Sequence, residues 1–234
     1  MNKKRFLASL LIMAILGIQI INPCIDAWVG ENSTPDEGVI QTLLQKTLVT
    51  KMIFEGGNEN WSCTYKVVDT IIKSGVVVEP VPNKFVLIPK LLENAYYDYT
   101  RKFSFFVSYS KAQFSGEHWL KTGEEFIVES NAPAPDPRES IQVKVVEWGK
   151  EEQFILVNII PANAITPETA LRKALEVYYR TYGIYPTADF TFTIEYYDQQ
   201  YWLVSYDDND GIGGKGVLLV DAFTGEPGEI KEDE

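Results

Sequence analysis

The chain has 234 residues, of which 45% are hydrophobic and 23% are charged, and its formal net charge at pH 7 is −12. This composition excludes disordered and collagen-like proteins and supplies enough apolar material for one or two hydrophobic cores. The acidic balance makes nucleic acids and anionic lipid headgroups poor partners, whereas cations and basic peptides are compatible with it. The 13 Tyr and 12 Phe residues, together with many Val, Ile and Thr, favour a protein rich in β-strands.

The N-terminal segment predicts export. Three basic residues precede an apolar run from Phe6 to Ile21, and this run is shorter than the roughly 20 residues of a membrane-spanning helix. The pattern matches a secretory signal, so we interpret residues 1–27 as a signal peptide cleaved after Ala27 or, if it is retained, as a signal anchor. Either outcome places the protein outside the cytoplasm, secreted or anchored to the outer face of the cytoplasmic membrane, with membrane contact only through this segment.

A linker over residues 28–51 is predicted to lead into an antiparallel β-sandwich over residues 52–160. The linker contains VGENSTPDEG, residues 29–38, which is polar and shows no apolar period. Strand-like runs separated by turn signals follow: WSCTYKVV, KFVLIP, RKFSFFVSYS, EEFIVES, IQVKVVEW and QFILVNI. Consecutive strands without helical crossovers are typical of a sandwich. Cleavage after Ala27 would remove Cys24 and leave Cys63 without a disulfide partner. Because Cys63 lies inside a strand-like run, it is interpreted as a small core residue.

Both ends of this region resemble a known module. FEGGNENWSCTYKV, from Phe54 to Val67, is similar to the opening of a small β-sandwich module found in Gram-positive envelope proteins. The segment from Ile141 to Val157 resembles the closing hairpin of that module, with Glu147, Trp148 and Gly149 at the turn. The middle of the region carries no such resemblance. The resemblance implies an envelope location and a sandwich fold, and it transfers no catalytic residue.

The C-terminal region, residues 161–234, is predicted to be a helix packed on an antiparallel β-meander, an α+β unit that folds on its own. Thr166 is a good N-cap, Pro167 suits the first helical position, and Gly183 ends the helix. One stripe of a 3.6-residue period is apolar and consists of Leu171, Ala174, Leu175, Tyr178 and Tyr182. The runs DFTFTIEYY, YWLVSY and VLLVDA then read as the strands of the meander.

The last of these strands ends in VDAFTGE, which suits either a turn or a catalytic fragment. The chain has one histidine, His118, so a Ser-His-Asp or Cys-His arrangement could be built only around it. We therefore interpret Asp221, Thr224 and Gly225 as turn residues. The sequence predicts no catalytic residue, no cofactor and no enzymatic activity.

The acidic, glycine-rich run DDNDGIGGKG, from Asp207 to Gly216, could gather oxygen ligands for Ca²⁺. The EF-hand spacing fails because Gly211 and Leu218 occupy positions where that motif places ligands. A solvated hairpin loop is the preferred interpretation. No metal site is predicted, and weak extracellular Ca²⁺ binding stays open as the alternative.

The C-terminal region resembles a PepSY-type domain, known from the propeptides of secreted metallopeptidases and from bacterial envelope proteins. The resemblance rests on ETALRKALEVYY, on the aromatic hairpin YYDQQYWLVSY and on the terminal VLLVDAFTGE, and it extends from Thr166 to about Ile230. It implies a non-enzymatic module that binds and restrains an extracytoplasmic peptidase, or binds another envelope protein. The alternative is a structural or adhesive cell-wall module without a peptidase partner.

Aromatic side chains of the C-terminal hairpin are the predicted binding residues. Strand alternation places Tyr197, together with Tyr201 or Trp202, on the outer face of the sheet, where exposed aromatic residues are typical recognition anchors. The binding prediction therefore names Tyr197, Tyr201 and Trp202. Cross-strand aromatic pairs that only stabilise the sheet are the alternative interpretation.

Overall fold

The computed structural model describes residues 37–70, 82–90, 100–121, 124–186, 190–208 and 214–232. The predicted signal segment, residues 1–27, lies outside these ranges. From residue 38 onward the described residues belong to one compact unit. The described part of the chain is mostly β, with two helices and a mixed sheet, and neither of these helices is long and apolar enough to cross a membrane.

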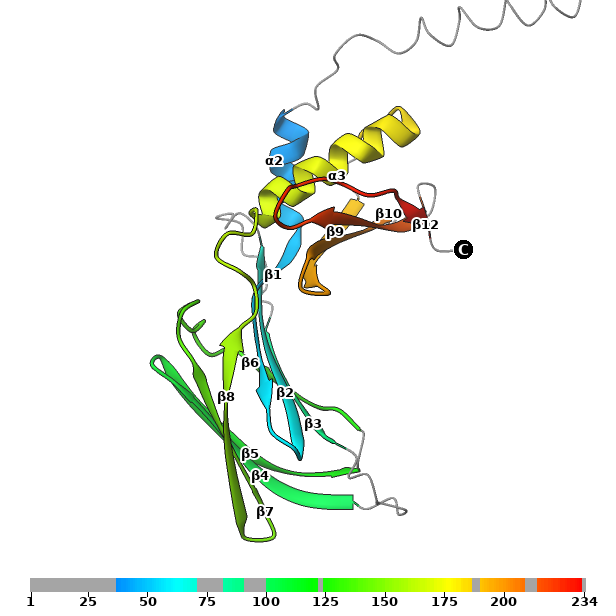
Figure 1. The fold of residues 1–234 in the computed structure, drawn as a ribbon. Coiled ribbons are helices and arrows are strands. Elements are labelled where there is room, and N and C mark those ends of the chain that lie inside the picture. The colour runs from blue at the N-terminus through cyan, green and yellow to red at the C-terminus, as the bar shows by residue number, and fades with distance from the viewer. Residues whose placement is uncertain are drawn as a thin grey trace, which may run out of the picture. The chain divides into compact units, whose positions relative to one another are not determined.

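Figure 1 shows the arrangement of these elements. The helices are α2 (Glu37–Lys46) and α3 (Pro167–Tyr182). The strands are β1 (Leu48–Gly57), β2 (Trp61–Thr70), β3 (Asn83–Pro89), β4 (Thr100–Tyr109), β5 (Ala112–Lys121), β6 (Phe126–Ser130), β7 (Ile141–Glu147), β8 (Lys150–Asn158), β9 (Phe190–Tyr197), β10 (Tyr201–Asp208), β11 (Lys215–Asp221) and β12 (Lys231–Glu232).

Strand β1 connects the two halves of the sheet. Along one edge it pairs with β2 from end to end. Along its other edge Leu48 and Val49 run parallel to β9, whereas the segment from Phe54 to Gly56 pairs antiparallel with β8. The order is therefore β12-β11-β10-β9-β1-β8-β7-β4-β5, with β2, β3 and β6 branching from β1. The parallel pairing makes the sheet mixed, which corrects the prediction of antiparallel strands throughout.

Strands β1 to β8 enclose the first hydrophobic core. Its largest contacts join rings from different strands: Trp61 of β2 lies 5.2 Å from Phe103 of β4, and Phe85 of β3 stacks 5.5 Å from Phe105 of β4. These contacts hold the layer of β2 and β3 against the layer that contains β4. Cys63 is buried in this core, where desolvation raises the pKa of its thiol. Its position agrees with the predicted core role and makes its thiolate inaccessible.

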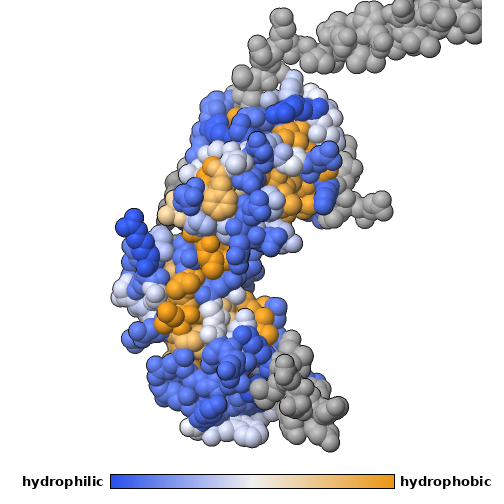
Figure 2. Space-filling view, viewed as in Figure 1, coloured by the Kyte–Doolittle hydropathy of each residue, from blue (hydrophilic) through white to orange (hydrophobic). Residues whose placement is uncertain are grey.

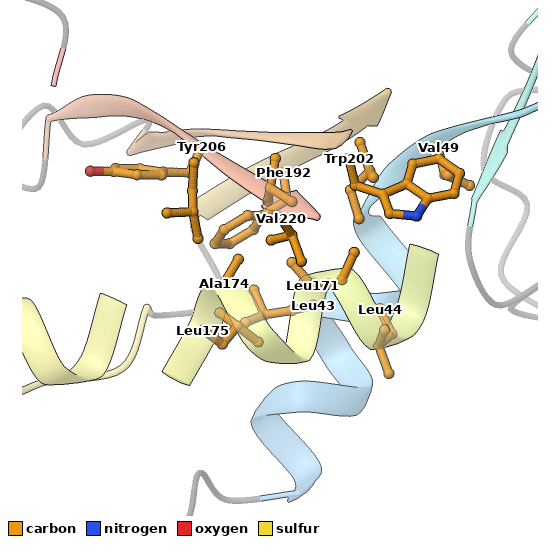
Figure 3. Packing of buried hydrophobic residues seen from close by; sticks show 14 of the residues in the cluster. Leu43, Leu44, Val49, Leu171, Ala174, Leu175, Phe192, Trp202, Tyr206 and Val220 are labelled. Carbon is orange, nitrogen blue, oxygen red and sulfur yellow. The ribbon is translucent and has the colours of Figure 1, made fainter. Parts of the chain in front are cut away.

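Helix α3 covers one face of β9, β10 and β11 and forms the second hydrophobic core with them. In Figure 3, Leu171 and Ala174 of α3 lie between the helix and Phe192 and Val220 of the sheet. The alternation of strand side chains buries every second residue of these strands against the helix, as in β9, where buried and less buried positions alternate from Phe190 to Tyr197.

The ends of α3 confirm the sequence prediction. The Thr166 hydroxyl oxygen accepts a hydrogen bond from the Thr169 backbone N–H at 3.2 Å, and Pro167 occupies the first turn. Gly183 has a φ of 72° and donates its N–H to the Tyr179 carbonyl at 2.7 Å. A capping hydroxyl and a left-handed glycine satisfy backbone groups that the helix itself cannot pair.

The predicted linker, residues 28–51, is wrong over its described part, because residues 37–46 form α2 and β1 begins at Leu48. Ile40, Leu43 and Leu44 of α2 are buried, and they belong to the same core as α3. Figure 3 shows Leu43 beside Leu171 and Leu175. The polar run VGENSTPDEG includes the first two residues of α2, so it gave no sign of this short amphipathic helix, whose buried residues lie on one side.

The predicted boundaries at residues 52 and 161 also need correction. Residues 38–53 contribute to the core beneath α3, so this core is not confined to residues 161–234. The described residues on both sides of position 160 lie in the same compact unit. The described residues form two hydrophobic cores, but β1 contributes residues to both of them.

Candidate protein-binding surface

The face of β9, β10 and β11 opposite α3 presents the predicted pair Tyr197 and Tyr201. Tyr197, the last residue of β9, is 52% exposed, and Tyr201, the first residue of β10, is half-buried directly opposite it. Directly opposed residues of an antiparallel pair have Cβ atoms about 5 Å apart. The two tyrosines therefore lie side by side on the face opposite α3.

The turn between the two tyrosines fixes their position. Asp198 and Gln199 adopt positive φ angles of 49° and 55°. The Tyr196 hydroxyl donates to the Gln199 carbonyl at 2.6 Å, and the Gln200 N–H donates to the Tyr197 carbonyl at 3.2 Å. Because Tyr196 is anchored in the core, its hydroxyl ties the turn to the buried face and holds Tyr197 on the opposite side.

Leucines extend this surface along the sheet. Leu203 of β10 is directly opposite Leu219 of β11 on one side and Glu195 of β9 on the other, and both leucines are half-buried. Glu195 forms an ion pair with Lys66 of β2. We call Tyr197, Tyr201, Leu203 and Leu219 the outer patch. It combines two phenol rings with aliphatic side chains and borders on an ion pair.

Trp202 does not belong to the outer patch, which corrects the binding prediction. Its side chain is 2% exposed and its ring packs 5.5 Å from Tyr196 in the core of α3. The indole N–H donates to the Ile165 carbonyl at 3.0 Å. Figure 3 shows the indole beside Val49. Adjacent strand residues point to opposite faces, so once Tyr201 faces outward Trp202 must face the core.

VDAFTGE forms a turn, as the sequence predicted. One Asp221 carboxylate oxygen accepts from the backbone N–H groups of Phe223 and Thr224 at 2.9 and 2.8 Å, and Gly225 has a φ of 75°. These backbone hydrogen bonds, from Thr224 first and then from Phe223, lower the pKa of Asp221 to about 2, with a further bond from Gln200. The carboxylate is therefore occupied by the turn it organises.

The other candidate chemical groups are also accounted for by local contacts. His118 is exposed and stacks 4.5 Å from Phe126. Asp207 accepts from Lys215 at 2.6 Å, while positions 209–213 of the acidic loop lie outside the described residues. Among the residues that the structure describes, no group of three or more His, Cys, Asp or Glu side chains is arranged to hold a metal ion.

Sequence reasoning missed an apolar cavity of about 430 Å³ beside Trp202. Val49 and Lys51 of β1 line it together with Ile160, Ile165 and Trp202. These residues come from three distant parts of the chain, so no local sequence pattern could have indicated the cavity. Lys51, one of the lining residues, forms an ion pair with Asp69 at 3.0 Å.

The exposure of two tryptophans was also not predicted from the sequence, although the turn position of Trp148 could have indicated it. Trp148 is 85% exposed and Trp119 is 61% exposed. Trp148 and Gly149 form the tip of the β7–β8 hairpin with φ angles of 51° and 78°, a two-residue turn that usually prefers Asn at its first position. A tryptophan in a left-handed, solvated turn position gains no burial in return. On the face shown in Figure 2, apolar residues reach the surface as separate patches among hydrophilic ones.

No family model, curated protein or solved structure matches this chain. The resemblances to a Gram-positive envelope module and to a PepSY-type domain therefore remain proposals.

Proposed function

We propose that this chain is a non-catalytic, exported protein of the bacterial envelope that binds a protein partner through the outer patch. In this proposal an N-terminal β-sandwich module carries a C-terminal PepSY-like α+β module. The observation that carries it is the Tyr197–Tyr201 pair, which lies on the one face of β9–β11 that α3 leaves uncovered.

The composition of the outer patch supports a protein partner. Tyrosine supplies a large ring and a hydroxyl at a low cost in side-chain entropy, and it is enriched at the centres of protein interfaces. Leu203 and Leu219 extend the apolar area, and the Lys66–Glu195 ion pair and the Gln200–Asp221 hydrogen bond lie at its border. An apolar centre with a satisfied polar border is the usual anatomy of a recognition surface.

The partner we propose is an extracytoplasmic peptidase, which the module restrains. This choice rests on the PepSY-like order of a capped helix, an aromatic hairpin and a terminal VLLVDAFTGE, and on the predicted export signal. Nucleic acid is not proposed as a partner, because a net charge of −12 opposes binding to phosphates.

Capture of secreted peptidases tests this function. The exported chain is immobilised and exposed to envelope and culture proteins after mild cross-linking, and bound peptidases are measured by activity and mass spectrometry. Tyr197→Ala should reduce capture at least tenfold, whereas Ile155→Ala, an equally exposed side chain on β8, should leave it unchanged. Equal capture by both variants would remove the outer patch from the proposal.

A structural or adhesive wall module is the second candidate, and the exposed tryptophans favour it. Trp148 and Trp119 belong to strands and turns of the first core and not to the PepSY-like region. Co-sedimentation with purified cell walls, compared between the wild type and Trp148→Ala, separates the two functions. Wall binding that depends on Trp148, with no peptidase captured, would replace the first proposal with the second.

A further inference from the structure

Strand β5 ends the sheet as an unpaired edge among the described residues. It pairs with β4 along all of its length, from Ala112 opposite Tyr109 to Lys121 opposite Thr100. The next strand in sequence, β6, pairs with β3 and not with β5. A long strand edge with open backbone groups is a template for another strand.

The hydrogen-bonding pattern identifies the open groups of β5. A two-residue turn joins β4 to β5, so the closing pair Tyr109–Ala112 exchanges hydrogen bonds, and bonding then alternates along the strands. The backbone N–H and C=O groups of the even-numbered residues of β5 therefore bond to β4. The outward residues Gln113, Ser115, Glu117 and Trp119 have no backbone hydrogen-bond partner among the residues that the structure describes.

The open window ends at Trp119. Lys121 would be the next outward residue, but its N–H donates to a Glu124 carboxylate oxygen at 3.1 Å and its carbonyl accepts from the Glu124 N–H at 3.1 Å. At the other end the chain turns back to β4 before Ala112. The window from Gln113 to Trp119 is thus bounded on both sides, and its centre is Gly116.

We propose that β5 pairs antiparallel with β5 of a second copy of this chain, across a two-fold axis at Gly116. Gln113 then lies opposite Trp119 of the second copy, and Ser115 opposite Glu117 of the second copy. All four open residues then form hydrogen-bonded pairs with residues of the second copy, and each pair exchanges two N–H···O bonds. The sheet order β8-β7-β4-β5 continues through the axis into the second copy.

The side chains fit this register. Each Glu117 faces a serine hydroxyl, so no like charges are directly opposed within the window, which would be destabilising. On the inner face Phe114 meets His118 of the second copy, an aromatic pair. The exposed Trp119 gains a neighbour in Gln113. Gly116 has no side chain because a Cβ there would lie 2.8 Å from the Phe105 ring, and the same absence keeps the axis free of steric conflict.

The interface is small, since one strand pair buries less than the roughly 1,200 Å² of a stable complex. The dimer therefore forms weakly, as complexes with small interfaces do. Such a state is expected at high local concentration, as on a membrane or wall surface. This dimer is independent of the proposed function, because its interface contains no residue of the outer patch.

Sedimentation equilibrium of the exported chain up to about 1 mM tests the dimer. Charge variants of one residue test the register: Ser115→Lys places a cation opposite Glu117 of the second copy at two symmetric positions and should tighten dimerisation several-fold. Ser115→Glu places like charges there and should weaken it at least tenfold. The matched controls are Gln142→Lys and Gln142→Glu on β7, an exposed residue of a strand paired on both sides, and they should have equal affinities.

Ser115→Pro removes an outward N–H and should abolish the dimer while preserving the fold, because proline is tolerated where an edge strand faces solvent. Circular dichroism checks the fold, and if this variant fails to fold the two charge variants decide. Amide exchange at Ser115 and Glu117 should slow as concentration rises. A wild type that stays monomeric at every concentration would overturn the proposal, even if it bound an added extended peptide along β5. Equal dimer affinities of Ser115→Lys and Ser115→Glu would also overturn it.

Discussion

The core enclosed by β1 to β8 draws its buried residues from one stretch, Phe54 to Leu156, whereas the core beneath α3 combines residues 40–53 with residues 170–222. The first core is closed mainly by strands that follow one another in sequence. The second closes only when α2 and the beginning of β1 meet a helix and sheet more than a hundred residues away. The second core therefore depends on two distant segments of the chain. Cutting the chain between these segments should affect the two cores unequally.

The largest expected effect follows from separating the two parts of the second core. A fragment of residues 161–234 should remain unfolded, contrary to the prediction from the sequence, because it lacks Leu43, Leu44 and Val49. A fragment of residues 38–160 should keep a cooperative thermal transition, because it retains the whole of the first core. Far-UV circular dichroism of both fragments tests this difference. A cooperative transition of the 161–234 fragment would show that α2 is dispensable.

Trp202→Ala should destabilise the protein by about 3–5 kcal/mol, the cost of deleting a large buried aromatic side chain. The lost indole bond to the Ile165 carbonyl contributes to this cost. Tyr197 lies on the opposite face of the same sheet, and Tyr197→Ala should change stability by less than about 0.5 kcal/mol. Urea unfolding of both variants measures the contrast, and similar costs for the two would contradict the assignment of faces.

Gly225→Ala should cost about 1 kcal/mol, because alanine resists a positive φ. A Cβ at this position would meet only Ile165 Cδ1, at 3.6 Å, which is ordinary contact. Gly149→Ala in the first half of the molecule is the matched variant, with a φ of 78° and open space around it. The two variants should cost the same in thermal unfolding. A clearly larger cost at Gly225 would mean that the turn also packs tightly against the second core.

The smallest expected effect is the pH dependence of Asp221. Its pKa in the folded protein is lowered to about 2, below the value of about 4 in unfolded chains. The carboxylate therefore stabilises the fold above about pH 4, and this contribution is lost as the pH falls through about 2. Asp221→Ala should melt at most a few degrees below the wild type at pH 7, and this difference should shrink as the pH falls through about 2. Glu229→Ala removes an exposed carboxylate of the same segment and is the matched control.

In the aromatic hairpin, the sequence contained enough information to assign Tyr201 and Trp202 to the correct faces of the sheet. Three residues, Asp198 to Gln200, separate Tyr197 from Tyr201, and directly opposed residues share one face of a sheet. This loop length already pairs Tyr197 with Tyr201 and Tyr196 with Trp202. Taking the loop length together with the alternation would have excluded Trp202 from the surface without any knowledge of the packing.

The sequence alone determined the elements whose causes are local: the capped ends of α3, its buried stripe, the alternation of β9, and the Asp221 turn. Each depends on residues within a few positions of one another, through hydrogen bonds and side-chain periodicity. The tertiary structure was needed to show that α2 joins the C-terminal core, that Leu48 and Val49 run parallel to β9, and that β5 lies at the edge of the sheet formed by the described residues. These features arise from burial and strand pairing between segments far apart in the chain, and no local pattern encodes which distant segment a strand or helix will meet.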